Sequence, residues 1–274
     1  MGLRVNTNIA SLNAQRNLGS ITSDLQGSYS RLSSGLRIAT AADDAAGLGI
    51  SEKMRSQIRS FDVASRNAQD GISMVQTAEG AMGEVSNILG RMRELAVQSS
   101  NGTLSTNDRA TIDTEFVALR DEIDRIANTT EFNGIKLGDG SNATASIQVG
   151  IGTSADDTID ITLQDVTTAT LAINALQTDD VTNSQAAITA LDTAIDDVNT
   201  SRGDLGATQN RLQSSFQSIR NVHENLSAAE SRIRDVDVAK ETATLTKNNI
   251  LQQAATSVLA QANQQPQLAL SLLG

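Results

Sequence analysis

The chain has 274 residues, of which 39% are hydrophobic but only 2% aromatic, and its formal net charge is -11. This acidity argues against nucleic-acid binding, because contacts to phosphates need clustered Lys and Arg. The sequence contains no cysteine, which excludes disulfides, thiol catalysis and thiolate metal sites. No apolar run approaches the roughly 18 residues that a membrane-spanning helix needs, so no membrane insertion is expected.

The first segment carries an apolar stripe. Its members, at steps of three and four, are Leu18, Ile21, Leu25, Tyr29 and Leu32. This spacing places them on one side of a helix. Ser and Gly at positions 33–35 then interrupt the pattern.

A far longer helical pattern follows at residues 43–98, where apolar residues fall at steps of three, four or seven. As one helix this segment would span roughly 80 Å at about 1.5 Å per residue. A compact domain of this chain length is only about 40 to 45 Å across. Either the molecule is a rod, or the helix is broken by the glycines Gly71, Gly80, Gly83 and Gly90.

The next segments predict a helix and then a β-hairpin. A turn cluster at 99–102 precedes possible N-caps at 106–108 and a second amphipathic run at 112–126, so two antiparallel helices are expected. From about residue 147 the period changes to the alternation of a strand, and it does so again at 159–163. We therefore predict a hairpin near residues 147–163.

The second half of the chain returns to helix. Residues 165–184 show no strong period and predict a short surface loop, whereas residues 188–226 repeat the helical seam. The last segment, about 239–273, carries apolar residues among many Gln, Asn, Ser and Thr. Such a helix is weak alone, and the same holds for the N-terminal segment, so each is expected to fold against the other and against neighbouring subunits. The terminal residues expected to build this polymerisation core are Leu18, Ile21, Leu25, Leu32, Ile250, Leu251, Val258 and Leu259.

Together these elements predict a mainly α fold, an elongated antiparallel helical bundle or coiled coil with one small β-hairpin region. A terminal coiled-coil domain is expected from residues 1–42 and 235–274, and a helical rod domain from residues 43–164 and 185–234.

Several motifs at the two ends resemble bacterial flagellin. They cover about residues 1–137 and 188–274, and they include Val5–Asn8, Arg31–Ile38, Asp43–Gly47, Ser65–Ser73, Arg93–Gln98, Ser231–Asp237 and Gln252–Gln264. About fifty residues separate the two matching parts, so the resemblance is to a short form without large outer domains. One departure is the terminal Gly274, where relatives often end in Arg.

The resemblance implies a structural subunit that polymerises with itself into the flagellar filament for swimming. Both termini would line the inner tube of the filament. The implied partners are other copies, a flagellar cap, hook-junction proteins and an export chaperone. Export through a type III apparatus without a cleavable signal peptide to an extracellular filament is implied as well. A hook-filament junction-like protein and a secreted helical adhesin or spacer are the alternatives.

The resemblance also implies a receptor-recognition site. Arg91, Leu95 and Glu115 match positions by which related flagellins engage Toll-like receptor 5. The alternative is that this surface packs subunits together, and receptor recognition would exploit it.

Nothing in the sequence predicts an enzyme, a cofactor or a metal site. Asp43 and Asp44 are expected to complement a helix N-terminus. The single histidine, His223, lacks the second histidine of a zinc-protease helix, and the run at 47–49 is too short for a nucleotide-binding loop.

Overall fold

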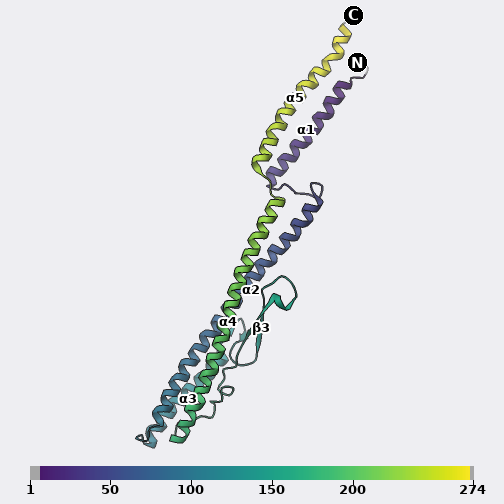
Figure 1. The fold of residues 1–274 in the computed structure, drawn as a ribbon. Helices are drawn as coiled ribbons and strands as arrows, with labels where there is room; N and C mark the ends of the chain where they lie inside the picture. The colour runs from purple at the N-terminus through teal and green to yellow at the C-terminus, as the bar shows by residue number, and fades with distance from the viewer. Residues whose placement is uncertain (1–6, 272–274) are drawn as a thin grey trace. The chain divides into compact units, whose positions relative to one another are not determined.

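The structure, a computed structural model, describes residues 7–271, and only the backbone for residues 265–271. Its helices are α1 (Ile9–Ser34), α2 (Ala45–Ser99), α3 (Thr106–Thr129), α4 (Val181–Arg234) and α5 (Val238–Ser271). Its strands are β1 (Glu131–Phe132), β2 (Ile135–Lys136), β3 (Thr144–Gln148) and β4 (Thr158–Thr162). Figure 1 shows the helices and the small β region. The predicted mainly α fold is confirmed, since the described residues hold five α-helices and only small antiparallel sheets.

Packing divides the chain into two compact units. The terminal unit comprises Met1–Ser56 and Asn225–Gly274, and the middle unit comprises Gln57–Glu224. The terminal unit therefore includes more of the chain than the ranges 1–42 and 235–274 expected from the sequence.

Helix α2 is continuous over 55 residues, so its glycines do not break it. Its buried residues Val75, Met82 and Leu89 repeat every seven positions, which is the seam of a coiled coil. Gly71 lies in the same seam, where a Cβ would come within 3.1 Å of Ile147 in β3. Glycine at this position therefore lets the hairpin pack closely against α2.

Helix α3 begins with a capping box. Ser105 is the N-cap, one residue before the predicted caps, and its side chain accepts from the Asp108 N–H while Asp108 accepts from the Ser105 N–H. The helix buries Ile112, Phe116 and Ile123 in the core of the middle unit.

Two antiparallel strand pairs occur in the described residues. β3 pairs with β4 as the hairpin that the alternating pattern predicted, and the observed register sets Ile147 opposite Ile159. The pairing of β1 with β2 was not predicted. Its turn uses Asn133 (φ 50°) and Gly134 (φ 79°), two positive φ values in succession, which suit a tight two-residue hairpin.

The segment 165–180, here named the strap, differs from the expected surface loop. It is irregular, but Val166, Leu171 and Ile173 are buried in the core of the middle unit. Two carboxylates of α3 hold its backbone: Asp124 accepts the Thr168 N–H at 2.8 Å, and Asp113 accepts the Thr178 N–H at 2.7 Å. Helix α4 then begins at Val181.

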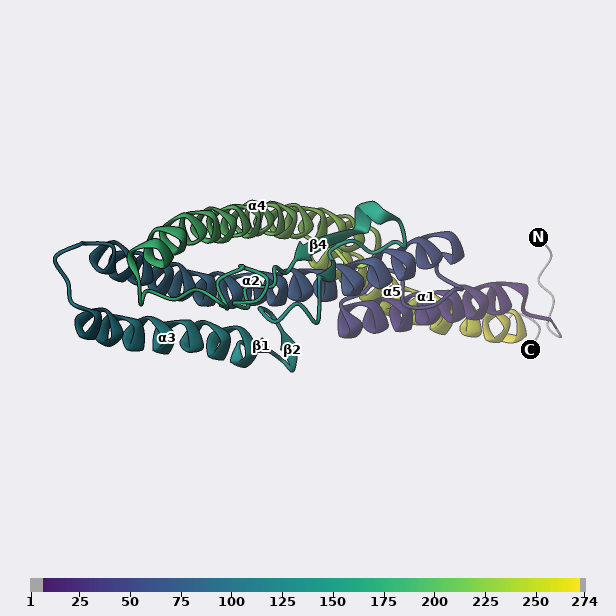
Figure 2. The same ribbon diagram turned by 90° about the horizontal axis from the view of Figure 1, so that it is seen from below.

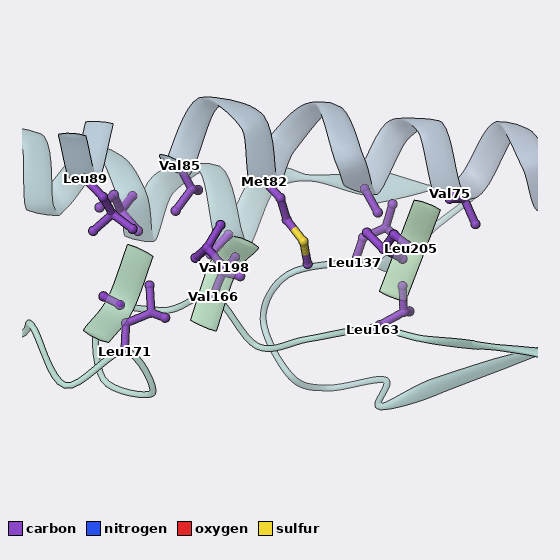
Figure 3. Packing of buried hydrophobic residues seen from close by; sticks show 14 of the residues in the cluster. Val75, Met82, Val85, Leu89, Leu137, Leu163, Val166, Leu171, Val198 and Leu205 are labelled. Carbon is purple, nitrogen blue, oxygen red and sulfur yellow. The ribbon is translucent and has the colours of Figure 1, made fainter. Parts of the chain in front are cut away.

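The core of the middle unit joins helices to irregular segments. In Figure 3, side chains of α2 such as Met82 lie close to Leu137 and Val166, and α4 contributes Val198 and Leu205. The core therefore contains large aliphatic side chains together with the buried ring of Phe116.

Candidate assembly surfaces

In the terminal unit, α1 and α5 lie side by side as an antiparallel pair, which both ribbon views show (Figures 1 and 2). Along α1 the shielded residues follow one another at steps of three and four. Those that are buried are Ser11, Ala14, Leu25 and Ser28, and those that are half-buried include Leu18, Ile21 and Leu32. The four α1 residues predicted for the polymerisation core are thus at least partly shielded within the single chain, whereas Tyr29, predicted in the same stripe, is 55% exposed.

Helix α5 has two distinct faces. The inner face consists of the shielded residues spaced by four and three, namely Glu241, Leu245, Asn248, Gln252, Ala255, Leu259 and Ala262. The outer face consists of Ile250, Leu251 and Val258, which are 61%, 40% and 56% exposed. Three of the predicted polymerisation residues on α5 are therefore open to solvent, and the fourth, Leu259, belongs to the inner face.

Polar contacts join α1 to α5 at the end of the pair near Asn8. The Asn8 side-chain amide donates to the carbonyl oxygen of Ala262 at 2.7 Å. The Ser11 hydroxyl donates to the Asn263 side-chain oxygen at 2.7 Å. Because most shielded residues in this part of the pair are small, these hydrogen bonds provide much of its specific geometry.

An ion pair joins the two helices at the opposite end. The Arg31 Nε and Nη2 both donate to Glu241 Oε1, at 3.1 and 2.9 Å. Burial would raise the pKa of the Glu241 carboxyl, but hydrogen bonds from Arg31 and Ser28 outweigh it, so this pKa lies below its ordinary value. Residue spacing did not predict this pair, because its members are 210 positions apart.

The chain segment after α1 and the segment before α5 pair in antiparallel fashion just beyond this ion pair. The Val236 N–H donates to the Gly35 carbonyl at 2.9 Å, and the Arg37 N–H donates to the Arg234 carbonyl at 2.6 Å. The Arg234 guanidinium also donates to Glu52 at 2.6 Å, which lowers the pKa of that carboxyl. Gly35 has a φ of 73°, a left-handed conformation that favours glycine at a helix C-terminus.

The candidate receptor residues do not form one surface. Arg91 on α2 donates to Glu115 on α3 at 3.0 Å and to Glu94 at 2.9 Å, and these bonds raise the pKa of its guanidinium. Both Arg91 and Glu115 remain about half exposed, at 50% and 48% of their side chains. Leu95 is only 2% exposed and belongs to the core. A partner could reach the ion pair directly, but Leu95 could only support it from beneath.

A shallow open face on α3 adjoins Glu115. Its lining residues, Ala110, Thr111, Thr114, Glu115 and Ala118, are small apart from the glutamate. It is thus continuous with the exposed side of the Arg91–Glu115 ion pair.

The acidic pair and the histidine have local structural contacts. The Asp43 carboxylate accepts from Thr40 and the Ala39 N–H, and these hydrogen bonds lower its pKa. Asp44 accepts from the Gly47 N–H at 2.9 Å in the first turn of α2. The His223 ring lies 3.1 Å from a carboxylate oxygen of Asp62. In the described part of the chain, no group of three or more His, Asp or Glu side chains is placed to hold a metal ion.

Comparison with known families decides the interpretation of these surfaces. The bacterial flagellin N-terminal helical region matches residues 5–143, and the bacterial flagellin C-terminal helical region matches residues 188–273. The chain belongs to the bacterial flagellin family. It is therefore a structural subunit of the flagellar filament, which assembles from many copies and drives swimming.

Individual flagellins resemble the chain over nearly its whole length. A flagellin of Halalkalibacterium halodurans is 52% identical over 269 residues, which cover 98% of this chain and 99% of the relative. A flagellin of Bacillus subtilis is 47% identical over 306 residues, covering 99% of this chain and 100% of the relative. The flagellar filament 33 kDa core protein of Treponema phagedenis is 46% identical over 283 residues, with 98% and 99% covered.

Solved structures agree with this assignment. The crystal structure of Bacillus cereus flagellin has 36% identity and a TM-score of 0.51, covering 60% of this chain and 94% of that one. A putative flagellar hook-associated protein from Vibrio parahaemolyticus has a TM-score of 0.60 at 16% identity, covering 70% of this chain and 100% of that one, and shows likeness of fold alone.

This flagellin is a short form. The alignment with Flagellin B of Vibrio cholerae spans 376 positions and all of both chains, although this chain has 274 residues. The relative thus contains additional residues that this chain lacks. None of the helices within residues 7–271 combines the length and apolarity needed to cross a membrane.

Proposed function

We propose that this flagellin assembles through its terminal unit, with residues 1–42 and 235–274 forming the inner tube of the filament. Residues 43–164 and 185–234 form the next layer, and residues 165–184 take the place of outer domains. The observation that supports this arrangement is the outer face of α5, where Ile250, Leu251 and Val258 are exposed in the single chain. Burial of such side chains between copies would supply the main driving force for assembly.

The helix α1 adds to the apolar surface of the terminal unit. Three large apolar residues of α1 are exposed, namely Ile9, Leu12 and Tyr29, at 55%, 53% and 55%. Ile9 and Leu12 lie on a different side of the helix from its buried residues. The buried residues of this helix pair are mostly small, so the pair buries little apolar area and is expected to be weak alone. Neighbouring copies would complete its hydrophobic core, as the coupled folding of two weak termini predicts.

The proposal extends to the partners of assembly and export. The chain would bind an export chaperone and would leave the cell through a type III apparatus without a cleavable signal peptide. It would then assemble beneath a flagellar cap, next to hook-junction proteins. The exposed apolar residues of the terminal unit support the proposal of a chaperone, because an unassembled subunit would otherwise associate nonspecifically.

Seeded polymerisation tests the proposed assembly. Protein monomerised by heat is mixed with short filament seeds in ammonium sulfate, which strengthens apolar burial, and is imaged by electron microscopy. Long uniform tubes are expected. Persistent monomers with ordered termini would contradict the proposal and would favour a helical adhesin or spacer.

Arg91 and Glu115 are proposed to take part in recognition by Toll-like receptor 5 and in subunit packing. Their support is the exposed ion pair beside the open face of α3. Leu95 would stabilise this surface from the core. Soluble monomer is expected to bind the receptor ectodomain, Arg91→Ala to weaken that binding, and intact filament not to bind. Equal binding by monomer and filament would contradict this part of the proposal.

A further inference from the structure

Apolarity does not decide which side of α5 packs against α1. The inner face contains Glu241, Asn248 and Gln252 among small or aliphatic residues, and the other side carries Ile250, Leu251 and Val258 among exposed polar residues such as Lys247 and Gln261. Because both sides mix apolar and polar residues, hydrophobic burial alone does not choose between them. A polar interaction can therefore select the inner face.

The small side chains of the inner face do not by themselves fix one alignment of α5 with α1. Ala255 and Ala262 are one heptad apart, so the small side chains would fit α1 in more than one alignment. Small residues bury little area and discriminate weakly between packing arrangements. Apolar packing therefore does not fix the orientation of α5.

Glu241 is the only charged residue on the inner face of α5. It is the only acidic residue in the sequence of residues 238–271, so Arg31 has a single carboxylate to meet on that helix. A single polar partner in a helical seam specifies register and orientation, because every other arrangement leaves it unpaired.

The position of the pair makes misalignment unfavourable. The Glu241 side chain is only 14% exposed and that of Arg31 is 31% exposed. Ser28, which is fully buried, lies beside the guanidinium and accepts from Arg31 Nη2 at 3.5 Å. Removing one partner from a shielded pair leaves an uncompensated charge, which is unfavourable.

The same face is used at both ends of α5. Glu241 and Ala262 are three heptads apart in sequence and therefore lie on the same side of the helix. Ala262 receives the hydrogen bond from Asn8 at the end of the pair opposite to Arg31. The antiparallel backbone pairing at Gly35 and Val236 holds the helix ends together, which leaves the choice of the α5 side that faces α1 to the contacts along the pair.

We propose that Arg31 and Glu241 are positioning residues that select the inner face of α5 for packing against α1. They thereby keep Ile250, Leu251 and Val258 on the outer face, where a second copy of the chain can cover them. This last step rests on the proposed assembly through the terminal unit, whereas the selection of the face is a property of the single chain.

Disulfide trapping in the full-length monomer tests the selection. The chain has no cysteine of its own, so two introduced cysteines can form only one disulfide within a molecule, and non-reducing electrophoresis separates it from disulfides between molecules. Ser11→Cys with Asn263→Cys reports the observed orientation, because these side chains are in hydrogen-bond contact. Ser11→Cys with exposed Gln261→Cys reports the alternative orientation. Gln261 is two residues from Asn263, so it points about 200° away around the axis of α5 and meets Ser11 only if the helix is rotated. The measured quantity is the ratio of the two oxidation rates.

Glu241→Lys places a second cation next to Arg31 and is expected to reduce this ratio about tenfold or more, because like charges in contact are strongly disfavoured. The matched control is Asp24→Lys, which makes the same charge change at an exposed site on α1 and should leave the ratio unchanged. Combining Arg31→Glu with Glu241→Lys restores opposite charges and should restore the ratio. If circular dichroism shows that Glu241→Lys loses helix, the milder Glu241→Gln is measured instead.

An unchanged ratio in Glu241→Lys, or in Glu241→Gln if that variant is used, would overturn the proposal, as would failure of the charge swap to restore the ratio. Seeded polymerisation of the same variants separates this result from the proposed function. If the unaltered chain does not polymerise, the proposed assembly fails while the trapping result still decides the role of Glu241. If it polymerises but the trapping ratio is insensitive to Glu241, only the positioning role fails.

Discussion

The two units of this flagellin bury their side chains in different ways. In the middle unit, α2, α3, α4, the hairpin and the strap bury large residues such as Phe116, Met82 and Leu89. In the terminal unit, the buried residues of the α1–α5 pair are mostly small, while Ile250 and Val258 are exposed. We therefore expect the middle unit to fold on its own core, and we propose that the terminal unit completes its core by packing against other copies.

The largest expected effect comes from truncating the core of the middle unit. Phe116→Ala should destabilise that unit by about 3–5 kcal/mol, because the ring is fully buried and leaves a cavity. Ile250→Ala should change the stability of the monomer by less than about 0.5 kcal/mol, since the side chain is 61% exposed. Urea unfolding followed by circular dichroism measures both.

Ile250→Ala should show its main effect in polymerisation and not in the stability of the monomer. Ile250→Ala should raise the critical concentration about tenfold or more, because it removes apolar area that another copy would bury. If Ile250→Ala unfolds the monomer and leaves polymerisation unchanged, the contrast between the two units is wrong.

A smaller effect is expected at the strap. Asp124→Ala removes the acceptor for both the Thr168 N–H and its hydroxyl, each at 2.8 Å, and should cost about 1–3 kcal/mol. Hydrogen exchange at Thr168 should rise in this variant. The exposed Asp160→Ala is the matched control and should have little effect on either quantity. Equal losses of stability in both variants would show that the hydrogen bonds from the strap to Asp124 do not stabilise the middle unit.

Acid should loosen the α1–α5 pair through Glu241. Its pKa is lowered in the folded chain, so its contribution to stability is present above the ordinary glutamate pKa of about 4.3 and is lost as pH falls through the folded value. The facing charges are Arg31 across the pair and Lys240 beside it. Tyr29, the only tyrosine in a chain without tryptophan, reports on α1 by its fluorescence anisotropy. Glu241→Gln should weaken the dependence of that signal on pH, and an unaltered pH profile would assign it to other groups.

The smallest expected effect is a gain in stability. Gly80 is an exposed position within α2, and a Cβ there would meet no atom within 4 Å. Gly80→Ala should therefore stabilise the monomer by about 0.5–1 kcal/mol through helix propensity. Gly71→Ala is the contrasting variant, since its Cβ would crowd Ile147, and it should not stabilise. A loss of stability in Gly80→Ala would mean that α2 is constrained there by contacts outside the described packing.

The sequence predicted the features that repeat. The heptads of Val75, Met82 and Leu89 indicated a long α2, and alternation around Ile147 and Ile159 indicated the hairpin. The strap was not predicted to reach the core, because its Val166 and Leu171 follow no helical or strand period and its anchoring carboxylates lie on α3.

The candidate sites were harder to predict because they depend on contacts between distant residues. Leu95 fits the helical seam with Met92, and that pattern already indicated burial, whereas the resemblance placed it on a recognition surface. The partnership of Arg31 with Glu241 has no local signal, since the two residues come from opposite ends of the chain. Charge scarcity on α5 is the one sequence feature that could have indicated it.

The most direct test of the account removes part of the terminal unit and measures both units. A chain truncated from Leu251 onward lacks much of α5, including two residues of its outer face. Electron microscopy of seeded samples should then show no filaments, while hydrogen exchange should show the amides around Met82 and Phe116 protected as in the full chain. Filaments from the truncated chain, or loss of protection in the middle unit, would contradict the claim that one unit folds alone and the other folds by assembling.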